Sequence, residues 1–204
     1  DQDLYGWGEA TVEWKTRAVV GAIEDLKPLL IGKDPRQIKQ NYQIMTKHGF
    51  WKLGVIGMSA ISGIEHAMWD ILGKSLNTPV WQLLGGKVRE KVKIYNHLGM
   101  GDMKALYRDT MNISALTDHA QKLVDLGYTA FKVVFIPFTH YTVLNEDLKL
   151  VHSLMSSLRN KVGDNIKIMV DFHGRCGSGI SAIQYTKELE PYNPMFIEEP
   201  IQPG

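Results

Sequence analysis

The chain has 204 residues, of which 44% are hydrophobic and 22% are charged, a composition typical of a globular protein of one or two domains. Its 23 basic and 22 acidic residues give a net charge of +1, which gives no support to nucleic-acid binding or to attachment to an anionic membrane surface. A single cysteine, Cys176, excludes a disulfide within the chain. No apolar run approaches the roughly 20 residues of a membrane span, and the first residues lack the layout of a signal peptide. We therefore expect a cytoplasmic protein with neither nucleic-acid nor membrane partners.

The first 90 residues predict a mainly helical unit. Residues 4–9 have the composition of a short strand interrupted by glycines. Apolar residues recurring at intervals of three and four then predict helices, which span 19–30, 36–45 and a longer stretch from Ser59 to the turn at 77–79. The segment 48–54, before the third helix, is aromatic and bounded by glycines, which is unusual for a simple connector.

Strands alternate with helices in the second half of the chain. The predicted strands are at 92–95, 130–135, 166–170 and 195–197, and the predicted helices between them are at 114–126, 145–158 and 180–189. This alternation predicts βα units and a parallel sheet. The sequence therefore indicates an α/β fold with a domain boundary near 87–91, which gives one domain at 1–90 and another at 91–204.

Two acidic residues stand where predicted strands end. Asp171 follows the apolar run 168–170, and Glu198 follows the run 195–197. The carboxyl ends of parallel strands meet at one edge, which is where active sites of α/β proteins lie. Carboxylates on neighbouring strands could share a Mg²⁺ ion, which prefers oxygen ligands. The alternative is that each acid caps the next helix or pairs with a basic residue.

His173 lies two residues after Asp171, so a strand-like alternation would return its side chain to the same side. Histidine is a common general acid or base because its side chain titrates near neutral pH. The alternative for His173 is a loop residue with no chemical role.

The most distinctive patterns of the chain are DFHGR at 171–175 and LEPYNPMFIEEP at 189–200. Further patterns are GWGEA at 6–10, GMSAISGIEHAMWDILGK at 57–74 and PVWQLLGG at 79–86. Together and in this order they resemble the mandelate racemase/muconate lactonizing subgroup of the enolase superfamily. Within it, they are most similar to the D-galactonate dehydratase-like sugar-acid dehydratases. The resemblance spans essentially the whole chain.

The resemblance implies an α+β capping domain followed by a TIM-type barrel. It also implies that Asp171 and Glu198 are Mg²⁺ ligands and that His173 is the general acid. The implied reaction is that of a lyase: the proton α to a carboxylate is removed, and the β-hydroxyl is eliminated to leave a 2-keto-3-deoxy sugar acid. Members of the family are usually homo-oligomers, so we expect the same of this protein.

Other candidate site residues follow from comparison with the subgroup pattern. Racemases of the subgroup carry Lys-x-Lys after the second barrel strand, whereas this chain has Lys132 followed two residues later by Val134. Racemisation through the second lysine is therefore not expected. Lys132 is a catalytic candidate that could neutralise the substrate carboxylate, or a structural lysine paired with an acid. His48 and Trp51 are substrate-binding candidates because their segment aligns with the loop that closes over the substrate.

Arg175 is open between substrate binding and pairing with a nearby acid, and His140 and Tyr141 are weaker candidates in the loop after the second strand. A TIM barrel needs eight strands, and only four are predicted here. We therefore expect the chain to hold about the first half of a barrel and to lack the opening strand of the cap. The third metal ligand and a histidine base would then lie elsewhere. The alternatives are another activity of the superfamily (epimerase, racemase or cycloisomerase) and a non-catalytic module.

Overall fold

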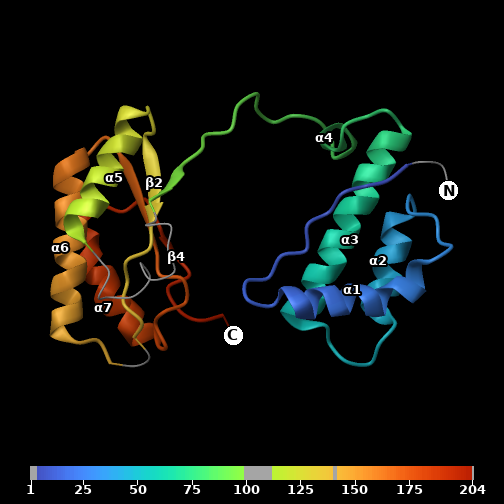
Figure 1. Cartoon of the computed structure of the whole chain (residues 1–204), viewed down its shortest axis with the longest axis horizontal. Coiled ribbons are helices and arrows are strands. Elements are labelled where there is room, and N and C mark those ends of the chain that lie inside the picture. Colours follow the sequence, from blue (N-terminus) through green and yellow to red (C-terminus); the bar gives the residue numbers. More distant parts are fainter. Residues whose placement is uncertain (1–3, 99–111, 140–141, 204) are drawn as a thin grey trace. The chain divides into compact units, whose positions relative to one another are not determined.

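The computed structural model describes residues 4–98, 112–139 and 142–203. The chain divides into two compact units, Asp1–Lys91 and Val92–Gly204, which are coloured blue to green and green to red in Figure 1. No helix in the part of the chain that is described has the length and apolar character needed to span a bilayer.

The first unit consists of helices packed around a small apolar core. The helices are α1 (Thr16–Leu30), α2 (Ile38–Lys47), α3 (Gly54–Ser75) and the short α4 (Val80–Leu83). The core is formed by fully or nearly fully buried side chains, which are Val19, Leu26, Ile38, Met45, Ala60, Ile61 and Met68. Helix α3 begins at Gly54, five residues before the predicted start, because its first turn already packs Ile56 against this core.

Residues 4–12 are extended, but they do not form the predicted strand, since none of these residues pairs with a strand in the described ranges. They lie instead along α3. The backbone N–H of Trp7 donates to Asp70 Oδ2 at 2.8 Å, and a Cβ added at Gly6 or Gly8 would collide with the α3 backbone. The glycines therefore permit the close approach of an extended segment to a helix.

The second unit is a parallel sheet covered by helices. Its strands are β1 (Asn96–Leu98), β2 (Ala130–Val133), β3 (Lys167–Asp171) and β4 (Ile197–Glu198), in the order β1-β2-β3-β4. The intervening elements are α5 (Ile113–Asp125), α6 (Asn145–Val162), α7 (Gly179–Leu189) and the 3-10 turn η3 (Glu190–Tyr192). The parallel pairing of all four strands confirms the predicted α/β class.

The first strand of this unit begins four residues later than predicted. Val92 and Ile94, which suggested the strand, are 74% and 67% exposed and belong to no strand. The pairing with β2 starts instead at Asn96, and Leu98 is the residue that becomes buried.

The register gives the sheet two different faces. Helices α5, α6 and α7 lie on one side of it (Figure 1), and the residues that pack there are apolar: Leu98, Phe131, Val133, Ile168 and Val170. Alternate residues point to the other face. That face carries the polar residues His97 and Lys132, with Asp171 and Glu198 at the strand ends. The fold thus separates a packed face from a charged face.

Candidate active site

Three charged side chains from three neighbouring strands meet on the charged face. Asp171 ends β3, Glu198 ends β4, and the two residues are register partners. Lys132, from β2, places its Nζ 2.9 Å from Asp171 Oδ2 and 2.9 Å from Glu198 Oε1. The ammonium group therefore bridges the two carboxylates.

The bridge is partly shielded from solvent. The side chains of Asp171, Lys132 and Glu198 are 6%, 15% and 34% exposed. Burial disfavours the charged form of Lys132, but hydrogen bonds to Glu198 and Asp171 outweigh burial and hold the pKa of Lys132 above its usual value. Lys132 therefore keeps its positive charge in this arrangement. It is paired with acids, which is the second of the two roles considered for it from the sequence.

His173 and Glu199 lie just beyond the strand ends, and both have a left-handed backbone, with φ values of 52° and 40°. The backbone N–H of His173 donates to Asp171 Oδ1 at 2.7 Å. The Nδ1 atom of His173 lies 3.6 Å from Glu199 Oε2 and 4.0 Å from Asp171 Oδ2. The N–H of Gly174 donates to the carbonyl of Glu199 at 2.9 Å. These bonds join the two strand ends and bring His173 to the same side as Asp171.

Asp171, His173 and Glu199 could hold a metal ion, since one ligand atom of each lies within 4.8 Å of the others. Oxygen-rich donors of this kind suit Mg²⁺. The predicted ligand Glu198 adjoins this group, but its Oε1 is engaged by Lys132. Glu199 was not predicted as a ligand, although its place beside Glu198 at a strand end was a usable signal.

His97 was also missed by sequence reasoning. It is the register partner of Lys132 on β1. Burial and the nearby charge of Lys132 lower the pKa of His97, while Asp171 and Glu198 oppose that shift. Its proximity to the acids depends on strand register, which no local pattern in the sequence reveals.

Arg175 is almost fully buried, with 2% of its surface exposed. Its Nη1 donates to the carbonyl of Ile136 at 2.6 Å, and its guanidinium carbon lies 4.9 Å from the centre of the Phe138 ring. Its Nε and Nη2 atoms are buried and have no hydrogen-bond partner among the residues that the structure describes. Arg175 thus connects the segment after β2 with the segment after β3. These segments also form an isolated parallel β-bridge between Thr139 and Cys176.

The other substrate-binding candidates belong to the first unit. His48 caps the end of α2, with Nδ1 at 2.9 Å from the carbonyl of Met45. Trp51 is 83% exposed and meets Phe50 edge to face. Their roles in substrate binding stay predictions. His140 and Tyr141 lie outside the described residues.

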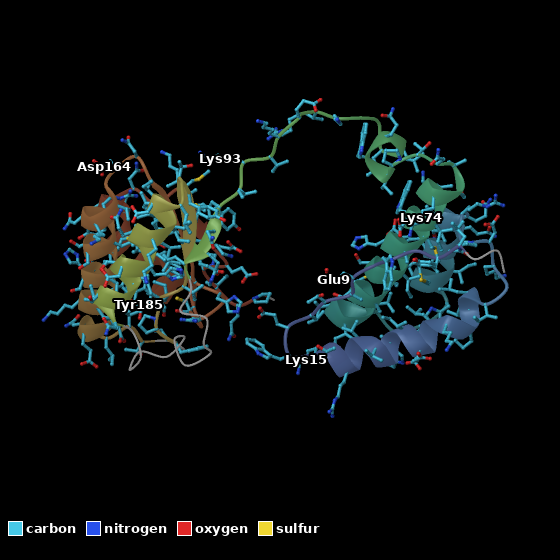
Figure 2. All side chains as sticks on the ribbon, turned by 45° about the horizontal axis from the view of Figure 1, so that its top comes forward. Glu9, Lys15, Lys74, Lys93, Asp164 and Tyr185 are labelled. Atoms are coloured by element: carbon cyan, nitrogen blue, oxygen red, sulfur yellow. The ribbon has the colours of Figure 1, made fainter. Side chains whose placement is uncertain are left out.

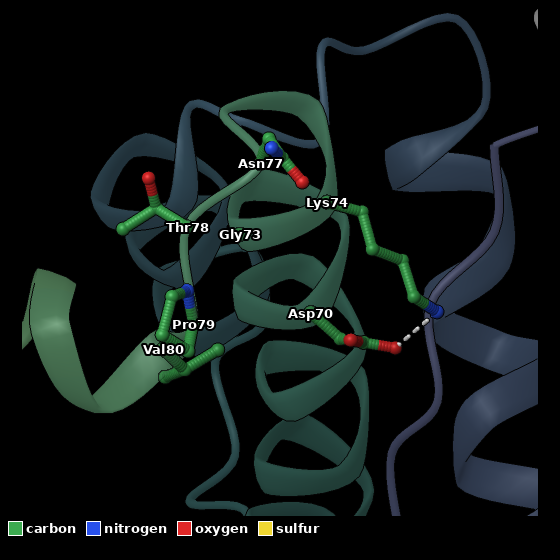
Figure 3. Close-up of a pocket in the computed structure, with 7 residues that line it drawn as sticks. All are labelled: Asp70, Gly73, Lys74, Asn77, Thr78, Pro79 and Val80. Carbon is green, nitrogen blue, oxygen red and sulfur yellow. Dashed lines mark hydrogen bonds and ion pairs between the residues drawn. The ribbon is translucent and has the colours of Figure 1, made fainter.

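Two hollows are lined by residues outside the charged cluster. One, of about 270 Å³, is at the end of α3 between Asp70, Lys74 and the segment 77–80 (Figure 3). Its charges are already paired, since Lys74 Nζ lies 2.7 Å from Asp70 Oδ2. The other, of about 480 Å³, is an apolar groove between α7 and residues 200–201. Neither hollow contains a group of carboxylates, a histidine and a lysine like the one at the strand ends. We therefore take the charged cluster as the candidate site.

Family models match both units of the chain. The N-terminal domain model of mandelate racemase/muconate lactonizing enzyme matches residues 1–85. The model described as enolase C-terminal domain-like matches residues 115–204, which include the strand-end acids.

Solved structures show the same similarity. A protein from Zymomonas mobilis ZM4, provisionally named a dehydratase, is 33% identical with a TM-score of 0.88, over 100% of this chain and 55% of its own. An enolase from Agrobacterium radiobacter, provisionally a galactarate dehydratase and bound to Na and L-malate, is 31% identical with a TM-score of 0.80, over 97% and 48%. An enolase from Pantoea ananatis with bound D-gluconate and Mg is 30% identical with a TM-score of 0.79, over 98% and 54%. The chain thus spans about half the length of these proteins.

Proposed function

Because this chain belongs to the mandelate racemase/muconate lactonizing enzyme family of the enolase superfamily, we propose that the full-length protein is a Mg²⁺-dependent sugar-acid dehydratase. It removes the proton α to a carboxylate and eliminates the β-hydroxyl, so that a 2-keto-3-deoxy sugar acid forms. The observation that carries the proposal is the meeting of Asp171 and Glu198 at adjacent strand ends, with His173 beside them.

The donor set fits the metal that the family implies. Asp171 and Glu198 would hold it, and Glu199 lies next to them as a further oxygen donor. When bound, Mg²⁺ supplies positive charge that stabilises the negative charge developing on the substrate carboxylate as the α-proton leaves. The third ligand and the base that removes the proton are assigned to parts of the protein beyond the described residues.

His173 is proposed to donate the proton that the departing hydroxyl needs. Its backbone N–H is fixed to Asp171 Oδ1 and its Nδ1 lies 3.6 Å from Glu199 Oε2. These contacts limit the positions that the ring can take. A positioned proton donor of this kind typically accelerates such a step about 10²- to 10⁴-fold.

The sequence Lys132-Val133-Val134, which lacks the second lysine of the racemase pattern, favours dehydration over racemisation. A lysine at residue 134 would supply a second base near the strand end, but the side chain there is apolar. Lys132 remains as a cation that can pair with an anionic substrate, and Arg175 holds the two neighbouring loop segments together. The small-molecule substrate proposed is an aldonic or aldaric acid, in line with the D-gluconate and galactarate named for similar structures.

The test is a panel of aldonic and aldaric acids incubated with the full-length protein and Mg²⁺, with formation of 2-keto acid as the readout. We expect at least one acid to be converted and D171N to abolish that conversion. The matched control is D164N, because Asp164 is an exposed acid on the outside of the same unit (Figure 2). If folded, Mg²⁺-loaded protein produces no keto acid from any member of the panel, the dehydratase proposal fails.

A further inference from the structure

We propose that Lys132 is an internal counter-ion of the metal site: it holds the two strand-end carboxylates together in the metal-free protein and is displaced from them by the divalent cation. Lys132 would then set how tightly the protein binds its metal. The proposal rests on the assignment of Asp171 and Glu198 as metal ligands in the proposed function.

The two strand-end acids repel each other unless a cation lies between them. Asp171 and Glu198 are direct register partners on adjacent strands, and such strands are only about 5 Å apart. Asp171 is 6% exposed, so water screens its charge poorly. Two carboxylates in this position need a cation between them, and Lys132 Nζ supplies one at 2.9 Å from each.

The ammonium group of Lys132 contacts the two carboxylate oxygens that a metal would need. Asp171 Oδ1 already accepts the backbone N–H of His173 at 2.7 Å. Its other oxygen, Oδ2, is the one that Lys132 contacts, and Oε1 of Glu198 is contacted by the same Nζ. A Mg²⁺ ion sits about 2.0–2.1 Å from its ligand oxygens. An ion bound by these two oxygens would therefore occupy the space of the ammonium.

The side chain of Lys132 can move without disturbing the sheet. Its backbone lies in β2, which is fixed by pairing on both sides, but its four-carbon side chain is flexible. Once displaced, the ammonium remains on the charged face, close to where an anionic substrate would approach. Metal binding would thus convert a structural ion pair into a free cation for the substrate carboxylate.

Calorimetric titration of the full-length protein with Mg²⁺ separates this inference from a purely structural ion pair. We expect K132M to bind Mg²⁺ roughly tenfold more tightly than the wild type or better, because a positive charge at the metal position has been removed. In EDTA, K132M should melt at a lower temperature than the wild type, and its rise on adding Mg²⁺ should be larger. K132R keeps the charge, so it should bind Mg²⁺ no more tightly than the wild type.

K149M is the matched control, since Lys149 is an exposed lysine of α6 in the same unit. It should leave the affinity for Mg²⁺ unchanged. Equal or weaker binding by folded K132M, or tighter binding by K132R, would overturn the inference while leaving the proposed function in place. Failure of the wild-type protein to bind Mg²⁺ would overturn both. Should K132M not fold, K132Q gives the same comparison with a polar, uncharged side chain.

Discussion

Replacing His173 by asparagine separates proton donation from the shape of the site. His173 has a φ of 52°, a conformation that asparagine adopts more readily than most residues. The bond from residue 173 to Asp171 Oδ1 comes from the backbone, so H173N keeps it. The ring contacts that are lost include 3.6 Å to Glu199, which is 59% exposed, and 4.0 Å to Asp171 Oδ2. Both are longer than a hydrogen bond, and we expect their loss to cost less than about 1 kcal/mol of stability. H173N should therefore fold normally.

The rate of dehydration should nevertheless fall about 10²- to 10⁴-fold in H173N, which corresponds to about 3–5 kcal/mol of lost transition-state stabilisation. Exchange of the α-proton with deuterated solvent, followed by NMR, should persist because removal of that proton does not require His173. The control is H152N, since His152 pairs with Glu188 between α6 and α7, away from the strand ends. Dehydration by folded H173N at the wild-type rate would refute the role of His173 as the general acid.

Three further predictions concern the framework of the site and the first unit. Tyr185 lies in the packed body of the second unit (Figure 2) and shares a buried hydrogen bond of 2.7 Å with Thr139. Y185F and T139V should each lower the free energy of unfolding in urea by about 1–2 kcal/mol. A double mutant whose loss equals the sum of the two single losses would contradict this pairing. Burial raises the pKa of Cys176 to about 11, so its thiol should react with alkylating reagents at neutral pH only after unfolding, and rapid labelling of native protein would argue against it. G8A should destabilise the first unit by about 1–3 kcal/mol because its Cβ would meet the backbone of α3. The control G21A, where nothing lies near the added Cβ, should leave stability equal or higher. Equal effects of the two changes on stability would contradict close packing at Gly8.

The sheet of the second unit was predictable because its strands are buried on the helix side and read as apolar runs. Residues 166–170 predicted a strand that the structure has at Lys167–Asp171, one residue later. The first strand was misplaced because Val92 and Ile94 resemble strand residues locally but are exposed, whereas β1 is fixed by pairing with β2. Pairing partners that are distant in sequence leave no local signal.

The acids at the strand ends were predictable for the same reason that the strands were. A polar residue directly after an apolar run in a parallel sheet lies at the edge where strand ends meet. The bridge of Lys132 to both acids was not predictable, because it depends on the register of three strands. Local pattern alone left Lys132 divided between substrate binding and an ion pair, and only the three-dimensional arrangement shows the ion pair.

The backbone after β4 explains why two consecutive glutamates both reach this site. In an extended strand, Glu198 and Glu199 would point to opposite faces. The left-handed backbone of Glu199 ends the strand and turns its carboxylate toward His173, while Glu198 stays with Lys132. A residue other than glycine adopts this conformation only when its surroundings hold it there, and such strain is commonest at functional sites.

The resulting cluster is electrostatically unbalanced in a way that matches a divalent cation. Asp171, Glu198 and Glu199 contribute three carboxylates, and Lys132 offsets one of them. Among these four side chains, two negative charges therefore remain unbalanced. A single lysine can hold such a group together but cannot neutralise it. Exchange of the lysine for Mg²⁺ would neutralise two of the three charges. It would also free the lysine for an anionic substrate. This charge balance supports the proposal that Lys132 holds the acids together without metal and is displaced when Mg²⁺ binds.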